Sequence, residues 1–152
     1  MNLMEILRPE CIKVPLENKQ KQGAIGELVD LLNNNGLLTD RDDAFAATLT
    51  REKTRSTGIG SGIAIPHGKC RGVKSLSMAV GIANDPIDFE SVDGKPVTIV
   101  ILLVSPVDQT GPHIQALARI SRIMLDEQLR GRLETATSAR QVYDLLSAKE
   151  RS

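Results

Sequence analysis

The segment Val97-Thr98-Ile99-Val100-Ile101-Leu102-Leu103-Val104 decides the fold of this chain, because it is almost continuously apolar and rich in β-branched residues. A strand that is covered on both of its faces has this composition. We therefore place residues 97–104 at the centre of a β-sheet. Just before them, Asp93-Gly94 marks a tight turn, which predicts a hairpin with the residues near Ile87 to Phe89.

Two helices are expected before this central strand. Apolar residues recur at helical spacing from Lys21 to Asn35, and Gly36 follows as a C-terminal stop. A second helix should begin near residues 39–40 and end near Lys53, with acidic residues in its first turn and Arg51 in its last. The positions expected to pack inward are Ala24, Ile25, Leu28, Leu31 and Leu32 in the first helix, and Phe45 and Leu49 in the second.

Two more helices are expected after the central strand. Pro112 suits the first position of a helix, which places His113 in the first turn. The segment Ser138-Ala139-Arg140-Gln141 has the pattern of a capping box that opens the last helix. The inward stripes predicted for these helices are Ile114, Leu117, Ala118, Ser121 and Leu125 in the first, and Val142, Leu145 and Leu146 in the second.

Further strands are expected at residues 62–65 and 76–82, so strands and helices interleave along the chain. This alternation predicts an α/β fold, a sheet with helices on both sides. The 152 residues, of which 41% are hydrophobic, suit one compact domain spanning residues 1–152 and leave no room for a second.

Charge and composition exclude several classes of partner. The 19 basic and 19 acidic residues are mixed and cancel, which argues against a nucleic-acid or membrane-surface partner. No apolar run approaches the ~20 residues of a membrane span, so we expect a cytoplasmic protein. Cys11 and Cys70 lie far apart outside any CxxC pattern, which disfavours a structural disulfide or a zinc knuckle.

The segment Ser56-Thr57-Gly58-Ile59-Gly60-Ser61-Gly62-Ile63-Ala64-Ile65-Pro66-His67-Gly68 is the strongest candidate for a functional site. Its glycines allow the backbone to approach a phosphate or a partner closely, and Pro66 fixes the direction in which His67 is delivered. An accessible imidazole is a nucleophile near neutral pH and can carry a covalent group. The alternative is a buried turn histidine that bonds only to backbone.

Several familiar chemistries are not supported by the same residues. The glycine run lacks the Gly-Lys-Ser/Thr ending of a phosphate-binding Walker loop, and it does not give the dinucleotide-binding GxGxxG pattern. Ser61 has no glycine two residues away on either side, as a nucleophile elbow requires. The two histidines, Cys70 and Asp108 lack metal-ligand spacing. We therefore expect neither a metal nor a cofactor.

A site assembled from separated pieces remains: His67 at a loop end, His113 at a helix start and Arg51 at a helix end. Each has a simpler explanation alone, since Arg51 could be a solvated charge and His113 a helix-capping side chain. Together they suit a phosphoryl group, whose oxygens need positive donors around them. Backbone N–H groups of the glycine segment would support such a group, and the candidates are Thr57, Gly58 and Gly68.

The REK triplet of residues 51–53, followed by STGIGSGIAIPHGK at residues 56–69, resembles the active-site signature of bacterial phosphotransferase-system enzyme IIA proteins of the fructose, mannitol and nitrogen-related class. The resemblance extends over the whole chain and includes His113 with the segment Leu117-Ala118-Arg119-Ile120-Ser121-Arg122. It implies a mixed sheet, a phosphorylated His67, and assisting roles for His113 and Arg51.

This resemblance implies a phosphohistidine carrier that is charged by a histidine phosphocarrier protein. The REK and STGIG residues of the signature favour the nitrogen-related regulatory type, which would act on target proteins. One alternative is a sugar-transport component that passes phosphate to a IIB domain. A second is a non-catalytic binding module.

Overall fold

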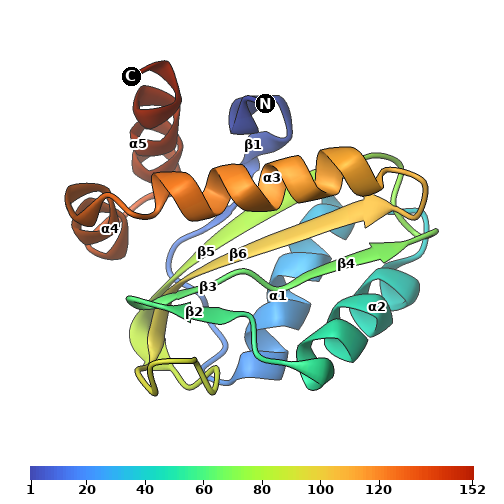
Figure 1. The fold of residues 1–152 in the computed structure, drawn as a ribbon, viewed down its shortest axis with the longest axis horizontal. Coiled ribbons are helices and arrows are strands. Elements are labelled where there is room, and N and C mark those ends of the chain that lie inside the picture. Colours follow the sequence, from blue (N-terminus) through green and yellow to red (C-terminus); the bar gives the residue numbers. More distant parts are fainter.

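The computed structural model describes residues 1–152 and shows one α/β domain built on a mixed six-stranded sheet (Figure 1). The strand order is β1-β5-β6-β3-β2, and β4 also pairs with β6. The strands are β1 (Leu7–Lys13), β2 (Gly58–Gly60), β3 (Ile63–Ala64), β4 (His67–Cys70), β5 (Ser77–Ile87) and β6 (Val97–Pro106). The helices are η1 (Leu3–Glu5), α1 (Lys21–Asn34), α2 (Arg41–Thr54), α3 (Thr110–Ile123), α4 (Glu127–Glu134) and α5 (Ala139–Arg151).

Strand β6 lies at the centre of the sheet and is covered on both faces, as its sequence predicts. Alternate side chains enter two separate apolar clusters, because successive residues of a strand point to opposite faces. Ile99, Ile101 and Leu103 pack on the side of α3, α4 and α5. Val100, Leu102 and Val104 pack on the side of α1 and α2. The domain is therefore a three-layer sandwich with helices on both sides, which confirms the predicted fold class.

The hairpin expected before β6 is present. Strand β5 runs antiparallel to β6, and the register ends with Ile87 opposite Val97. In the connection, the Gly94 N–H donates to the Ser91 carbonyl at 2.9 Å. Gly94 has a φ of 72°, a conformation that favours glycine. Strand β5 is longer than expected, since it continues to Ile87.

The bounds of the first two helices match the expectation, but the buried residues of α2 are not the predicted Phe45 and Leu49. Helix α1 ends at Asn34, and Gly36 adopts a φ of 74° as the helix stop. Helix α2 is capped by the Asp40 side chain, which accepts from the Asp43 N–H at 3.1 Å. It packs on the sheet through the small residues Ala44 and Thr48, while Phe45 and Leu49 lie at the margin of the cluster.

The structure corrects the expectation for α3 in two respects. The helix begins at Thr110, so Pro112 is its third residue rather than its first. The buried residues are His113, Ala116, Ile120 and Ile123, whereas Ile114 is 59% exposed and Leu125 is 76% exposed. The predicted stripe is therefore wrong. Apolar residues lie on more than one face of this helix, and the face that packs on the sheet carries Ala116, Ile120 and Ile123 together with His113.

Three strands, the short helix η1 and helix α4 were not predicted from the sequence. Strand β1 is an edge strand with Pro9 inside it, a position where proline is tolerated. Strands β2 and β4 are short, with 3 and 4 residues. Helix α4 has 8 residues, is capped by Asp126 and buries Leu129 and Leu133.

The last helix begins as predicted, with a modified capping box. The Gln141 N–H donates to the Ser138 hydroxyl at 3.2 Å. The Gln141 side chain accepts from the Thr137 N–H at 3.0 Å rather than from the Ser138 N–H. Val142 and Leu146 are buried, and Leu145 is partly buried.

Candidate functional site

His67 is the first residue of β4, directly after the short break that separates this strand from β3. Both strands pair in parallel with β6, and in the break the Pro66 carbonyl accepts from the Leu103 N–H at 3.0 Å. The backbone that carries His67 is therefore part of the sheet on both sides of the residue.

The ring of His67 is oriented by its own main chain. Its Nδ1 lies 2.8 Å from the Ile65 carbonyl oxygen. A carbonyl oxygen can only accept, so Nδ1 carries the proton and donates. The opposite nitrogen, Nε2, consequently has a free lone pair, which is the atom of a neutral imidazole that can act as a nucleophile.

Electrostatics keep this lone pair available. Burial lowers the pKa of His67 below its usual 6.5, and the charge of Arg51 acts in the same direction. The hydrogen bond to Ile65 opposes both effects but does not reverse them. The side chain is half-buried, so it is restrained and still accessible.

His113 lies beside His67, as the sequence analysis expects. The centroids of the two rings are 5.5 Å apart, with an angle of 59° between the ring planes. His113 is only 4% exposed. Burial lowers its pKa to about 4, and the neighbouring His67 and Lys69 contribute in the same direction. His113 is therefore neutral at physiological pH.

Arg51 and His67 line the same open hollow of about 280 Å³. The Arg51 side chain is oriented by its Nη1, which donates to the Arg55 carbonyl at 2.8 Å. Thr57 and Gly58 also line the hollow, with Leu117 and Ser121 of α3 facing them, whereas Gly68 does not. The structure thus brings together His67, Arg51, Thr57 and Gly58, with His113 against His67.

The backbone amides of Thr57 and Gly58 are already engaged within the protein. The Thr57 N–H donates to Glu52 Oε2 at 2.9 Å, and the Gly58 N–H donates to Ser56 Oγ at 3.0 Å. Gly68 lies against the backbone of α2, where an added Cβ would be 3.0 Å from the Thr48 nitrogen. The glycines therefore permit close packing here, and Thr57 and Gly58 shape the wall of the hollow.

Glu52 and Lys21 contribute to the site but were missed by the sequence analysis. The Glu52 side chain is 4% exposed, and its carboxylate lies 2.8 Å from Lys21 Nζ. It also accepts from the N–H and the hydroxyl of Thr57. This ion pair joins α1, the end of α2 that carries Arg51, and the glycine segment. Glu52 stands in the REK triplet, but no sequence pattern pairs it with Lys21.

Lys21→Met should lower the free energy of unfolding by about 2–3 kcal/mol, because it leaves the buried carboxylate of Glu52 without a compensating charge. Urea denaturation measures this change. The matched control is Lys19→Met, whose partner pair with Asp85 has side chains that are 76% and 68% exposed. The control should cost less than about 0.5 kcal/mol. Equal effects of the two substitutions would contradict a structural role for the buried pair.

The fold should lose stability as the pH falls from 6.5 toward 4. His113 has its pKa lowered from 6.5 to about 4 in the folded state, so in this window the unfolded chain binds a proton that the folded chain does not. The contribution is fully present above pH 6.5 and declines by about 1.4 kcal/mol per pH unit below it. Urea titrations of wild type and His113→Gln at pH 7, 6 and 5 measure the slopes. Identical slopes would contradict the burial of a neutral His113.

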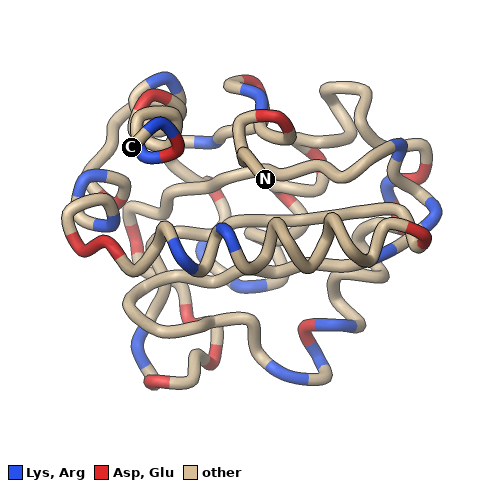
Figure 2. The backbone as a smooth tube through the Cα atoms, turned by 45° about the horizontal axis from the view of Figure 1, so that its top comes forward, with Lys and Arg blue, Asp and Glu red and all other residues tan.

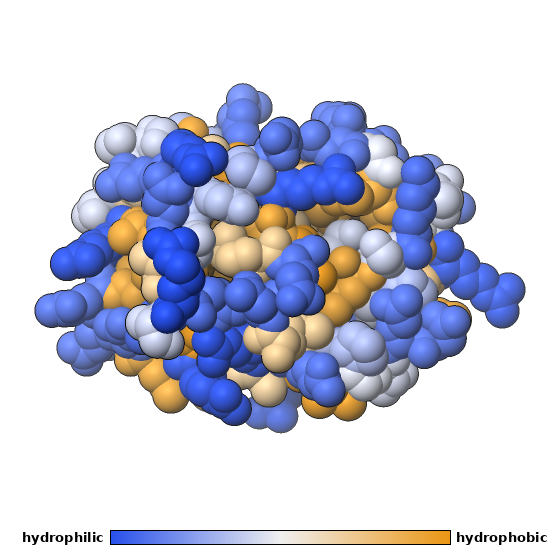
Figure 3. All heavy atoms as spheres, turned by 90° about the horizontal axis from the view of Figure 1, so that it is seen from above, coloured by the Kyte–Doolittle hydropathy of each residue, from blue (hydrophilic) through white to orange (hydrophobic).

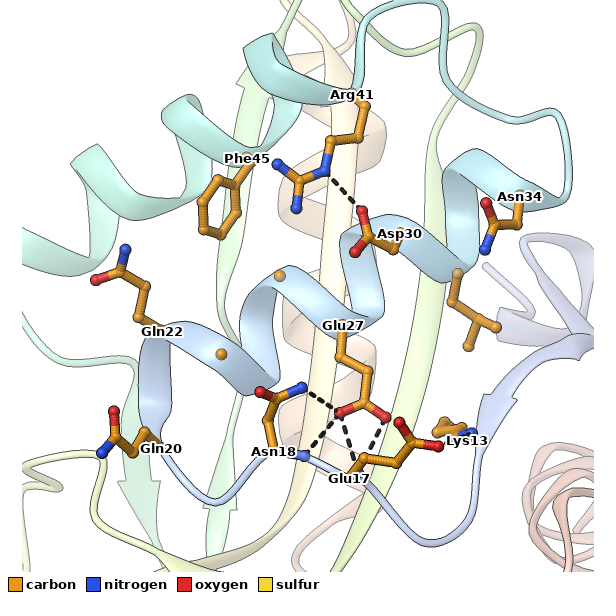
Figure 4. A pocket seen from close by; sticks show the side chains of 13 residues that line it. Lys13, Glu17, Asn18, Gln20, Gln22, Glu27, Asp30, Asn34, Arg41 and Phe45 are labelled. Atoms are coloured by element: carbon orange, nitrogen blue, oxygen red, sulfur yellow. Dashed lines mark hydrogen bonds and ion pairs between the residues drawn. The ribbon is translucent and has the colours of Figure 1, made fainter.

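A larger hollow of about 780 Å³ lies elsewhere, along α1 and the start of α2 (Figure 4). Its polar groups bond mainly to one another. The Glu27 carboxylate accepts from the main chain of Glu17 and Asn18, and Arg41 Nε lies 2.6 Å from Asp30 Oδ1. The Glu27 contacts hold the connection between β1 and α1, and the Arg41–Asp30 contact joins α2 to α1. We therefore assign a structural role to this hollow, which lies away from the histidines.

The geometry defines a class of protein: an α/β domain that presents an unprotonated imidazole nitrogen beside a second imidazole and an arginine. Residues 5–149 match the family described as "Phosphoenolpyruvate-dependent sugar phosphotransferase system, EIIA 2". The chain therefore belongs to the type 2 EIIA family of the phosphotransferase system, which confirms the resemblance seen in the sequence.

Individual relatives carry two kinds of name. The chain is 36% identical over 151 residues to the fructose-specific EIIABC component of Bacillus subtilis, covering 99% of this chain and 24% of that protein. It thus spans about a quarter of the length of this relative. It is also 34% identical over 153 residues to the nitrogen regulatory protein of Escherichia coli, covering 99% and 92% of the two chains.

The comparison of structures agrees with these matches. The crystal structure of nitrogen regulatory protein IIA-Ntr from Neisseria meningitidis superposes with a TM-score of 0.84 at 34% identity, over 93% of this chain and 97% of that one. None of the helices is both long and apolar enough to cross a membrane.

Proposed function

We propose that this protein is a phosphohistidine carrier, in which His67 Nε2 accepts a phosphoryl group from a histidine phosphocarrier protein. One observation carries the proposal: Nδ1 of His67 donates to the Ile65 carbonyl, which leaves Nε2 as the bare nitrogen at the edge of the hollow. Membership of the EIIA family supports the same chemistry.

In the transfer, the Nε2 lone pair attacks the phosphorus atom of a phosphohistidine on the carrier. The new N–P bond forms as the donor N–P bond breaks, and the departing imidazole keeps the electron pair of that bond. His67 then has substituents on both ring nitrogens and carries a positive charge. The Ile65 carbonyl, already bonded to Nδ1, stabilises this charge through a hydrogen bond to a charged donor.

Arg51 and His113 assist the transfer without accepting the group. Arg51 lines the hollow and supplies a permanent positive charge for the phosphoryl oxygens. His113 is neutral, so it can assist through a hydrogen bond but not as a second cation. Thr57 and Gly58 support the site by shaping the hollow.

The surface around the hollow suits brief contact with protein partners. Ile59 is 49% exposed and Val92 is 73% exposed beside His67, whereas Ile63 is buried in the core. Helix α3 has two basic residues, Arg119 and Arg122, and no acidic residue. Figure 2 shows this helix mostly uncharged. The face that carries the two chain ends, seen from above, is mainly hydrophilic, with apolar side chains toward its middle (Figure 3).

The relatives named nitrogen regulatory protein, which this chain covers over nearly their whole length, favour the nitrogen-related regulatory role. Such a protein would bind different targets in its two phosphorylation states. Transfer to a IIB domain of a sugar transporter is the second candidate, because the fructose-specific relative includes a similar segment.

Phosphorylation places a doubly charged phosphoryl group beside Arg51 while the His67 ring becomes positive, so the altered charge at the site should change which partners bind. NMR titrations of the unmodified and phosphorylated protein with candidate regulators and a IIB domain measure this change. We expect at least one regulator to bind only one of the two states, through a small interface of under ~1,200 Å². Identical partner sets in both states would leave a simple relay in place of a switch.

A further inference from the structure

Ser105 lies near the end of β6, directly beneath the start of α3, and is completely buried. Its Oγ lies 2.6 Å from Nδ1 of His113. This contact is the only hydrogen bond of the Ser105 hydroxyl. The two histidines of the site therefore both use Nδ1 for an internal bond, one to a carbonyl and the other to a hydroxyl.

The difference between these two partners determines where the protons lie. A hydroxyl can donate or accept, so two arrangements are possible for the neutral ring of His113. If His113 Nδ1–H donated to Ser105, the serine hydrogen would remain buried without an acceptor, at a cost of about 1–3 kcal/mol. If Ser105 O–H donates to Nδ1, every buried hydrogen of the pair is bonded. The second arrangement is favoured.

We propose that Ser105 is a positioning residue that donates its hydroxyl hydrogen to His113 Nδ1 and thereby places the single ring proton of His113 on Nε2. Because it assigns a role within phosphoryl transfer, this inference rests on the proposed function. The two neighbouring rings then have opposite tautomers. His67 has a bare Nε2 that attacks, and His113 has an Nε2–H that donates to the phosphoryl oxygens.

The alternative tautomer would oppose the reaction. With its proton on Nδ1, neutral His113 would direct a lone pair from Nε2, which would repel the phosphoryl oxygens. Protonation cannot supply the missing donor at neutral pH, because burial and the nearby His67 and Lys69 hold the pKa of His113 at about 4. The hydroxyl of Ser105 is thus the group that selects the His113 tautomer with its proton on Nε2.

NMR tests the proton positions directly, because the chain has only two histidines and hence four ring nitrogens. Long-range proton–nitrogen spectra of protein labelled with ¹⁵N-histidine distinguish the two tautomers, and His67→Ala assigns the signals. We expect the proton on Nδ1 in His67 and on Nε2 in His113 at pH 7.5. A proton on Nδ1 of His113 would overturn the proposal, and this measurement on wild type requires no Ser105 variant.

Ser105→Ala tests the consequence for transfer. We expect the Nδ1 signal of His113 to move toward that of a nitrogen without a hydrogen bond, and transfer from the phosphocarrier to slow about 10-fold, the equivalent of one hydrogen bond. Ser105→Thr, which keeps the hydroxyl, should restore both. The control is Ser77→Ala, a buried serine on β5 whose hydroxyl donates to the Ser75 carbonyl at 2.9 Å.

An unchanged Nδ1 signal or a wild-type rate in folded Ser105→Ala would overturn the proposal. A 10-fold loss in Ser77→Ala as well would do the same, since it would assign the effect to general packing. Failure of the proposed function is a separate result: wild type would then take up no phosphoryl group, while the ring protons would still report on Ser105.

Discussion

His67→Ala should reduce phosphoryl uptake to background while the protein remains folded. The substitution removes the imidazole whose Nε2 has a free lone pair, and no other group that lines the hollow is a comparable nucleophile. The assay is incubation with phosphoenolpyruvate, enzyme I and a phosphocarrier protein. Wild type should give an acid-labile, base-stable adduct with one phosphoryl group per chain.

His113→Ala provides the control for this experiment, because it removes an imidazole from the same site and leaves the acceptor in place. Urea denaturation shows whether each variant is folded. Stoichiometric labelling of His67→Ala would show that another residue accepts the group, and the assignment of the acceptor would be wrong.

Arg51→Ala and His113→Ala should each slow phosphoryl transfer by about 100-fold, the effect of losing one preorganised donor to a developing charge. Labelling should still reach completion, because His67 is intact in both variants. Rapid-quench measurement of the labelling rate tests this expectation. Arg51→Lys should recover only part of the rate, since lysine lacks the planar fork of donors that fits phosphoryl oxygens.

Arg140→Ala is the matched control for the loss of a positive charge. Arg140 lies on α5 in an exposed pair with Asp144, away from the hollow. Its rate should remain within about twofold of wild type. Wild-type rates in both Arg51→Ala and His113→Ala would place these residues outside the reacting centre.

The central part of the fold was predictable because its signals are local. The apolar run of β6, the glycine that stops α1 and the caps of α2 and α5 each act through a few neighbouring residues. The placement of α3 failed for a related reason. Apolar residues occur on more than one face of this helix, so their spacing does not decide which face packs on the sheet, where Ala116, Ile120 and Ile123 are buried with His113.

The main residues of the candidate site could be proposed from the sequence, but the residues that hold them in place could not. His67, His113 and Arg51 stand in recognisable segments, and the structure brings them together. Lys21, Glu52 and Ser105 act through partners that are distant in sequence or lie on another element. No periodicity or spacing relates such pairs, since only the packed structure brings them into contact.

The break between β3 and β4 has a consequence for the order of events in a relay. His67 stands on backbone that the central strand holds on both sides, and the bond from its Nδ1 to the Ile65 carbonyl holds the ring in one orientation, so the ring does not swing from a donor on one side to a recipient on another. Both partners must come to the same nitrogen from the same direction, and each must leave before the next arrives. The relay should therefore obey ping-pong kinetics, with an excess of either partner in its unphosphorylated form acting as a competitive inhibitor of the other.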